Sequence, residues 1–135
     1  MKNLLSTLLI ISLISTASAQ ADWLGFRGSN SNGIATGKAP QKFSEDSIVW
    51  EVNVPGKAAS SPIVVNGQII VTASSGVRQD RLHVISFDSA TGHINWHRQF
   101  WATGRTLCHP TSANAAPTPV SDGKHIVAFL SLIHI

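Results

Sequence analysis

The chain has 135 residues, enough for one modest domain, and charged residues make up only 13% of it. Such a low charged fraction is typical of a strand-rich protein rather than of one covered by surface helices. The formal net charge is +3, but the basic residues are scattered along the chain, which argues against a nucleic-acid-binding protein. The single cysteine, Cys108, excludes an intrachain disulfide.

Residues 1–19 have the features of a cleavable export signal. Lys2 provides a positive start, an apolar run follows at 4–14, and Ala17-Ser18-Ala19 has the small-x-small pattern of a cleavage site. Ala19-Gln20-Ala21 offers a second such site. The apolar run is shorter than the roughly 20 residues that span a bilayer, and no cysteine lies nearby. We therefore expect a periplasmic or secreted protein that is not a lipoprotein.

Residues 20–46 predict an extended N-terminal arm. The arm opens with Asp22-Trp23-Leu24-Gly25-Phe26-Arg27-Gly28 and continues through a stretch rich in Ser, Asn and Gly. No helix start follows these glycines, so a phosphate-binding loop is not expected. Trp23 and Phe26, like Phe100 and Trp101 further on, could stack on a sugar, but such residues more often anchor a segment or seal a packing contact.

From residue 47 onward the sequence predicts strands joined by tight turns. A first short strand is expected at 47–54, and four more at 61–65, 68–72, 82–87 and 93–100. Asn66-Gly67 is a strong hairpin signal, because both central residues of a type I′ turn need positive φ. Asp88 and Gly92 suit a second turn. The result is one antiparallel meander, with Ile94 and Trp96 expected on a common face.

The meander begins to repeat. Residues 61–71 resemble residues 117–127, with Gly67 and Gly123 at equivalent positions 56 residues apart, while Trp50 and Trp96 lie 46 apart. Four-stranded repeats of about 40–50 residues are typical of β-propeller blades. The predicted fold class is therefore all-β, a β-propeller of four-stranded antiparallel blades, with about one and a half blades in residues 47–129.

We expect this chain to be the N-terminal fragment of a longer protein. One and a half blades leave apolar sheet faces without neighbours and should not fold alone. Residues 130–135 (Leu130 to Ile135) show no turn signal, and they can be encoded by a stretch resembling a sequencing-library adaptor. An adaptor-derived artefact is the favoured interpretation, and a natural apolar strand end is the alternative.

The motif Asp88-x-x-Thr91-Gly92-x-x-x-Trp96 resembles the repeat of the pyrroloquinoline-quinone (PQQ) propellers. In that family a Trp of each blade docks against a small residue of a neighbouring blade, which implies structural roles for these four residues and for Trp50, Gly67 and Gly123. The family usually has Ala where this chain has Ser86, whose hydroxyl would need a hydrogen-bond partner.

Two further stretches are similar to large exported PQQ-like proteins of planctomycete-type bacteria, a group that resembles outer-membrane assembly factors. They are the opening at 22–28 and the pair of segments 105–110 and 116–120. The resemblance speaks for fold more than for activity, because the same repeat serves quinone dehydrogenases, assembly factors and scaffolds.

The resemblance also raises the possibility of PQQ catalysis. The related dehydrogenases hold PQQ with Ca²⁺ through carboxylate and amide oxygens, use a catalytic Asp, and often carry a disulfide of adjacent cysteines. Cys108 has no adjacent cysteine, and no such ligand set can be matched here. We predict no cofactor. Binding of PQQ and calcium is the alternative only if a missing part of the protein supplies their ligands.

Cys108-His109 invites a haem or metal interpretation. Haem attachment needs Cys-x-x-Cys-His, and Arg105 occupies the first cysteine position. Zinc usually needs three or four converging ligands, which His93, His97, Cys108 and His109 would have to supply. Cys108 as a nucleophile would need a base oriented toward it. Ordinary loop and strand-edge residues are the preferred interpretation, so neither a metal nor a catalytic residue is predicted.

The predicted function is that of a non-catalytic binding or assembly scaffold in the cell envelope, whose partner is a protein or an envelope component. The alternative is a PQQ-dependent dehydrogenase whose cofactor site lies in a missing C-terminal part. A glycan-binding or hydrolytic propeller would need paired carboxylates, and none can be placed.

Overall fold

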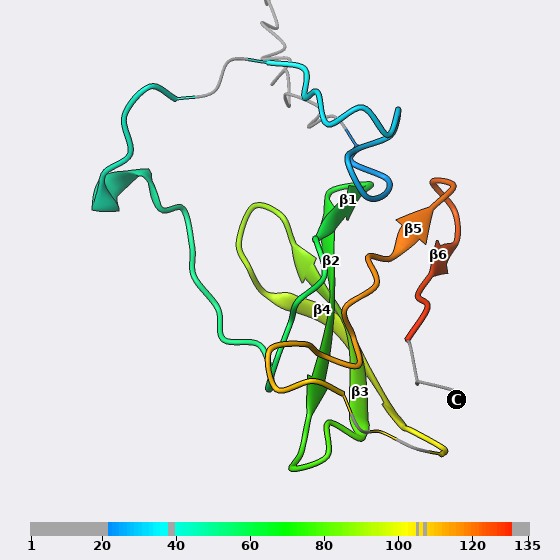
Figure 1. Ribbon diagram of the computed structural model, residues 1–135. Helices are drawn as coiled ribbons and strands as arrows, with labels where there is room; N and C mark the ends of the chain where they lie inside the picture. Colours follow the sequence, from blue (N-terminus) through cyan, green and yellow to red (C-terminus); the bar gives the residue numbers. More distant parts are fainter. Residues whose placement is uncertain (1–21, 38–39, 105, 107, 131–135) are drawn as a thin grey trace, which may run out of the picture.

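The computed structural model describes residues 22–37, 40–104, 106 and 108–130 (Figure 1). The predicted export signal at 1–19 and residues 131–135 of the predicted artefact lie outside this range. Within the described part, no helix is both long enough and apolar enough to cross a membrane.

Two antiparallel sheets make up the regular structure. The first has four strands in the order β1-β2-β3-β4, and the second pairs β5 with β6. The strands are β1 (Ile63–Val65), β2 (Gln68–Ser75), β3 (Arg81–Asp88), β4 (Ile94–Trp101), β5 (Val120–Ser121) and β6 (Ile126–Val127). The predicted four-stranded antiparallel meander and the all-β class are confirmed, with the second sheet beginning the next repeat.

The β1–β2 hairpin has the predicted left-handed turn. Asn66 and Gly67 have φ angles of 49° and 71°, and β1 pairs with β2 on either side of them, from Val65 opposite Gln68 to Ile63 opposite Ile70. Positive φ at both central residues is what a type I′ turn requires.

The β3–β4 pair contains an irregularity that the sequence did not reveal. Ser86 lies opposite Trp96, but Phe87 lies opposite Ile94, so the register shifts by one residue between them. Neighbouring residues of a strand point to opposite faces, and a bulge therefore separates the faces of Ile94 and Trp96. Ile94 is 59% exposed while Trp96 packs against the core. The expectation of a common face was wrong.

A buried apolar cluster lies on one face of the four-stranded sheet, and Ile85 and Phe87 are buried on the other face. Ile63, Val65, Ile70 and Val84 form this cluster. The second sheet covers this cluster through Ile126, and Ala128 and Leu130 extend the cover; Leu24 of the arm and Trp96 complete it. The two repeats are thus joined by apolar contact.

The strand expected at 47–54 is not present. Residues Glu45–Ser47 form a short 3₁₀ turn, η1, and residues 48–54 are irregular. A strand requires a hydrogen-bonded partner, and the ladders of the described residues include none for this segment. Its position is set instead by the side chain of Trp50.

The long connection from β4 to β5 is held by a buried polar contact. Asn114 is 2% exposed, and its Nδ2 donates to the carbonyl oxygens of Gln79 (3.1 Å) and Thr106 (3.0 Å). The Gln79 Oε1 accepts from the Asn114 amide at 3.2 Å and from the Ser74 hydroxyl at 2.9 Å. This contact fixes the connection against the β2–β3 turn.

Candidate functional site

The repeat motif builds a tight turn between β3 and β4. The Asp88 Oδ1 accepts hydrogen bonds from the Ala90 amide (3.1 Å), the Thr91 amide (2.8 Å) and the Thr91 hydroxyl (2.8 Å). These bonds stabilise the charged carboxylate and hold the pKa of Asp88 below its usual value. The bond from the Thr91 hydroxyl has the largest effect, followed by the bond from the Thr91 amide. Gly92, with φ at +72°, donates its amide to the Asp88 carbonyl and closes the turn.

Trp50 docks on this turn. Its indole Nε1 donates to the Ser89 carbonyl oxygen at 3.0 Å, and its ring stacks on Phe87 with centroids 6.4 Å apart. A Cβ at Gly92 would lie 2.7 Å from the Trp50 ring, so only glycine leaves room for the indole. The Trp50 side chain therefore holds the segment that precedes β1 against the β3–β4 turn.

Trp96 lies on the opposite face of the sheet, beside Ser86 on the neighbouring strand. Ser86 is fully buried, and its hydroxyl donates to the Gln68 Oε1 at 2.7 Å. The partner that this hydroxyl needs is thus supplied by β2, which explains how a serine is accommodated where the PQQ repeats usually have alanine.

Gly67 and Gly123 occupy equivalent turns, and the two turns touch. The Asn66 Nδ2 donates to the Gly123 carbonyl oxygen at 2.7 Å. The β5–β6 turn is closed by Asp122, whose Oδ1 accepts hydrogen bonds from the amides of His125 and Lys124. The bonds from the His125 amide, the His125 side chain and the Lys124 amide hold the Asp122 pKa well below its usual value. Successive repeats are therefore linked turn to turn as well as through the core.

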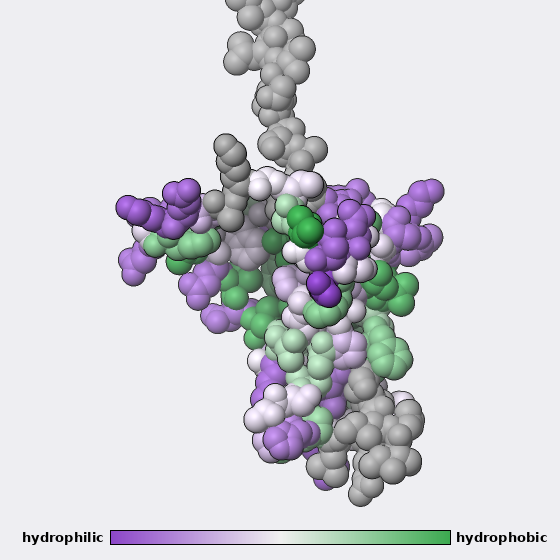
Figure 2. Space-filling view, turned by 45° about the horizontal axis from the view of Figure 1, so that its top comes forward, coloured by the Kyte–Doolittle hydropathy of each residue, from purple (hydrophilic) through white to green (hydrophobic). Residues whose placement is uncertain are grey.

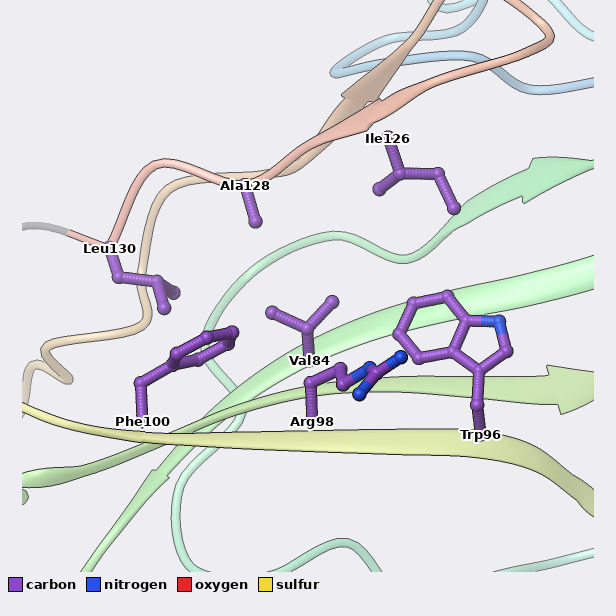
Figure 3. Close-up of a pocket in the computed structure, with 7 residues that line it drawn as sticks. All are labelled: Val84, Trp96, Arg98, Phe100, Ile126, Ala128 and Leu130. Carbon is purple, nitrogen blue, oxygen red and sulfur yellow. The ribbon is translucent and has the colours of Figure 1, made fainter.

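A groove of about 550 Å³ runs between the two sheets (Figure 3). Val84, Trp96, Arg98 and Phe100 point into it from β3 and β4. Ile126, Ala128 and Leu130 line it from the other side. The groove is the open part of the contact between the two repeats, so we assign it to blade packing rather than to a ligand.

A different surface gathers exposed side chains at the far end of the sheet, where β2 turns into β3 and β4 ends. We call it the turn-end surface and define it by Val77, Arg78, Arg81 and Trp101. Val77 is fully exposed and Trp101 is 63% exposed, with the Arg81 guanidinium 5.3 Å from the centroid of the Trp101 ring. In Figure 1 this end lies opposite the arm. Figure 2 shows another face of the molecule, on which exposed apolar side chains lie among strongly hydrophilic ones.

The residues considered for a metal site lie in separate surroundings. The His109 Nδ1 is 2.7 Å from the Thr111 hydroxyl, and the Cys108 thiol lies 3.9 Å from the Ser112 carbonyl oxygen. His97 faces another histidine, His83. Among the described residues, no three of the types His, Cys, Asp and Glu come together as metal ligands would.

His83 is a buried polar residue that the sequence reasoning did not single out. It is 3% exposed in β3, its Nδ1 lies 2.9 Å from the His97 Nε2, and its Nε2 lies 2.8 Å from the Ser75 hydroxyl. Burial, followed by the neighbouring His97 and Arg81, lowers the pKa of His83. A histidine within an apolar strand could have marked His83 as a buried polar residue. Its contact with His97 could not be predicted, because it depends on the register of β3 and β4.

This histidine pair predicts an acid-sensitive fold. Because the folded state lowers the His83 pKa below 6.5, the unfolded chain binds more protons between the two values. The free energy of unfolding should therefore be highest above pH 6.5 and should fall as the pH drops below it. Urea unfolding at a series of pH values between about 7.5 and 5 measures this slope.

His83→Gln should flatten that slope, and His109→Gln is the matched control because His109 is exposed and bonds only within its own turn. Asp88 and Asp122, whose lowered pKa values lie below 3.8, do not contribute in this range. Equal slopes in the wild type and the His83 variant would contradict the assignment.

Comparison with protein families gives one result. A family model of PQQ repeats, described as outer membrane protein assembly factor BamB, matches residues 39–132. Comparisons with curated proteins and with solved structures find no match. The matched range covers more than half of the chain and includes both sheets, Trp50 and the Asp88–Gly92 turn.

Proposed function

The chain belongs to the PQQ-repeat family whose model is described as outer membrane protein assembly factor BamB, and from this premise we propose that it is a non-catalytic binding scaffold of the cell envelope. Its role is to present surface side chains to a partner protein from a rigid sheet. The family description supports an assembly partner. The predicted signal at 1–19 supports export.

The turn-end surface is the observation that carries the proposed binding role. Trp and Arg dominate the energetics of many protein interfaces, and here Trp101 and Arg81 stack on each other at an exposed strand end. The fully exposed Val77 offers a further apolar side chain in the turn that leads from β2 into β3. The buried Asn114 contact holds the adjoining connection in place, so the surface is ordered before a partner binds.

The charge of this surface indicates the chemistry of the partner. Arg78 and Arg81 are both exposed at this end of the sheet, with Asp80 between them in the sequence, and the Arg81 guanidinium lies over the Trp101 ring. A guanidinium group favours a carboxylate, which it binds through two parallel hydrogen bonds. We propose a partner segment that combines acidic and apolar side chains.

A cofactor titration separates this role from that of a quinone-dependent dehydrogenase. The exported protein, purified from its source, is titrated with PQQ in the presence of calcium, and alcohol-dependent reduction of a dye is followed. A scaffold gives neither saturable PQQ binding nor dye reduction. Stoichiometric PQQ binding with turnover would assign the protein to the dehydrogenases and overturn the proposal.

Export is tested on the same material. Mass spectrometry of the protein from the envelope fraction should find an N-terminus at Gln20, or at Asp22 if the second cleavage site is used. A protein that retains Met1 to Ala19 in the cytoplasm would contradict the envelope location.

A further inference from the structure

The arm lies along the first strands of both sheets. The Trp23 amide donates to the Val64 carbonyl of β1 at 2.8 Å, and the Val64 amide donates to the Trp23 carbonyl at 2.9 Å. The next carbonyl, that of Leu24, accepts a hydrogen bond from the Ser121 amide of β5 at 2.8 Å. Each of these strands is the edge of its sheet, so the arm pairs with two edges at once.

The side chains of Asp22 and Leu24 contact the body of the protein, and that of Trp23 between them is half-buried. The Asp22 Oδ1 accepts from the Asn66 amide at 3.0 Å, at the β1–β2 turn. Leu24 packs against the buried cluster between the sheets. The body thus contacts an acidic and an apolar side chain, with the backbone of the aromatic residue between them bonded to β1.

The arm also folds back on itself to hold this geometry. The Gly28 amide donates to the Gly25 carbonyl, and the Ser29 hydroxyl donates to the Asp22 carbonyl at 2.8 Å. Gly28 has φ at +85°, and a Cβ there would lie 2.8 Å from the Trp23 ring. The returning arm therefore packs closely against the Trp23 ring.

We propose that the edges of β1 and β5 form a two-sided slot for an extended acid–aromatic–leucine peptide, and that the arm is its built-in occupant. Extended peptides bind exposed sheet edges through backbone hydrogen bonds, and pockets for their side chains give specificity. The slot lies at the end of the sheet opposite the turn-end surface, so it is a second binding place that does not depend on the function proposed above.

Hydrogen exchange on the full chain tests whether the arm fills both edges. The amides of Val64 and Ser121 are bonded to the arm, whereas that of Ile85 lies in the centre of the sheet. Trp23→Ala should speed exchange at Val64 and Ser121 together, by tenfold or more, and leave Ile85 protected. Phe26→Ala, at a 65% exposed arm residue, is the control and should change none of the three. Loss of protection at only one edge, or at neither, would overturn the two-sided slot.

Peptide binding tests the slot itself. A labelled peptide of residues 22–29 should bind saturably to the full chain carrying Trp23→Ala and Leu24→Ala, and it should restore slow exchange at Val64 and Ser121. Wild-type chain, whose slot is filled, should bind the peptide at least tenfold more weakly, and a peptide with both residues changed to Ala should not bind. Absence of binding, or equal affinity for both proteins, would refute the proposal.

Discussion

Replacing Gly92 with alanine is expected to lower the free energy of unfolding by about 3 kcal/mol. Gly92 has φ at +72°, which costs an alanine about 1–2 kcal/mol. The new Cβ would also lie 2.7 Å from the Trp50 ring, which is held by its bond to Ser89 and cannot easily yield. Displacing the indole costs roughly another 1–3 kcal/mol. Urea unfolding followed by tryptophan fluorescence measures the loss.

Gly67→Ala is a closely matched control for this variant. Gly67 has φ at +71°, but the nearest atom to its added Cβ would be the Ser89 hydroxyl, 4.0 Å away. It should therefore lose only the backbone component, about 1–2 kcal/mol. If both alanine variants lose the same amount, Trp50 does not pack against the turn as described.

Replacing Asn114 with alanine is expected to cost about 2–3 kcal/mol. The substitution leaves the carbonyl oxygens of Gln79 and Thr106 without the amide that bonds them in a buried site. A buried polar group without a partner costs about 1–3 kcal/mol, which exceeds the net gain of an ordinary hydrogen bond. The free energy of unfolding measures the loss, and faster exchange along the β4–β5 connection should accompany it.

Asn30→Ala serves as the control, because Asn30 is exposed in the arm. Its substitution should change stability by less than about 0.5 kcal/mol. A similar small change in the Asn114 variant would mean that the connection is held by something other than this amide.

Local signals in the sequence were sufficient for the meander. Asn66-Gly67 and the Asp88–Gly92 motif specify turns through their own backbone and side-chain chemistry, so the four strands between and beside them could be placed. The repeat of these turns also indicated a second blade, whose first two strands the structure contains.

Contacts between distant residues set the limits of the prediction. Trp50 was predicted to lie on a strand at 47–54, but its side chain bonds instead to the Ser89 carbonyl, 39 residues away. The shift between Ser86 and Phe87 is a one-residue irregularity with no sequence signal. It decides which side chains of β4 face the core, and hence that His97 meets His83.

The candidate binding surface was only partly visible in the sequence. Trp101 could be noted as an aromatic at a strand end, but its stacking with Arg81 depends on the register of β3 and β4. The exposure of Val77 follows from the turn in which it lies rather than from its apolar character.

Photo-cross-linking from the turn-end surface tests the binding role most directly. A benzoylphenylalanine at Val77, whose side chain is fully exposed, is compared in intact cells with one at Ile34, which is 72% exposed in the arm. We predict a discrete adduct with an envelope protein from position 77 but not from 34, and its loss when Trp101→Ala or Arg81→Glu is added. No adduct from position 77, or one that persists in both variants, would contradict the account.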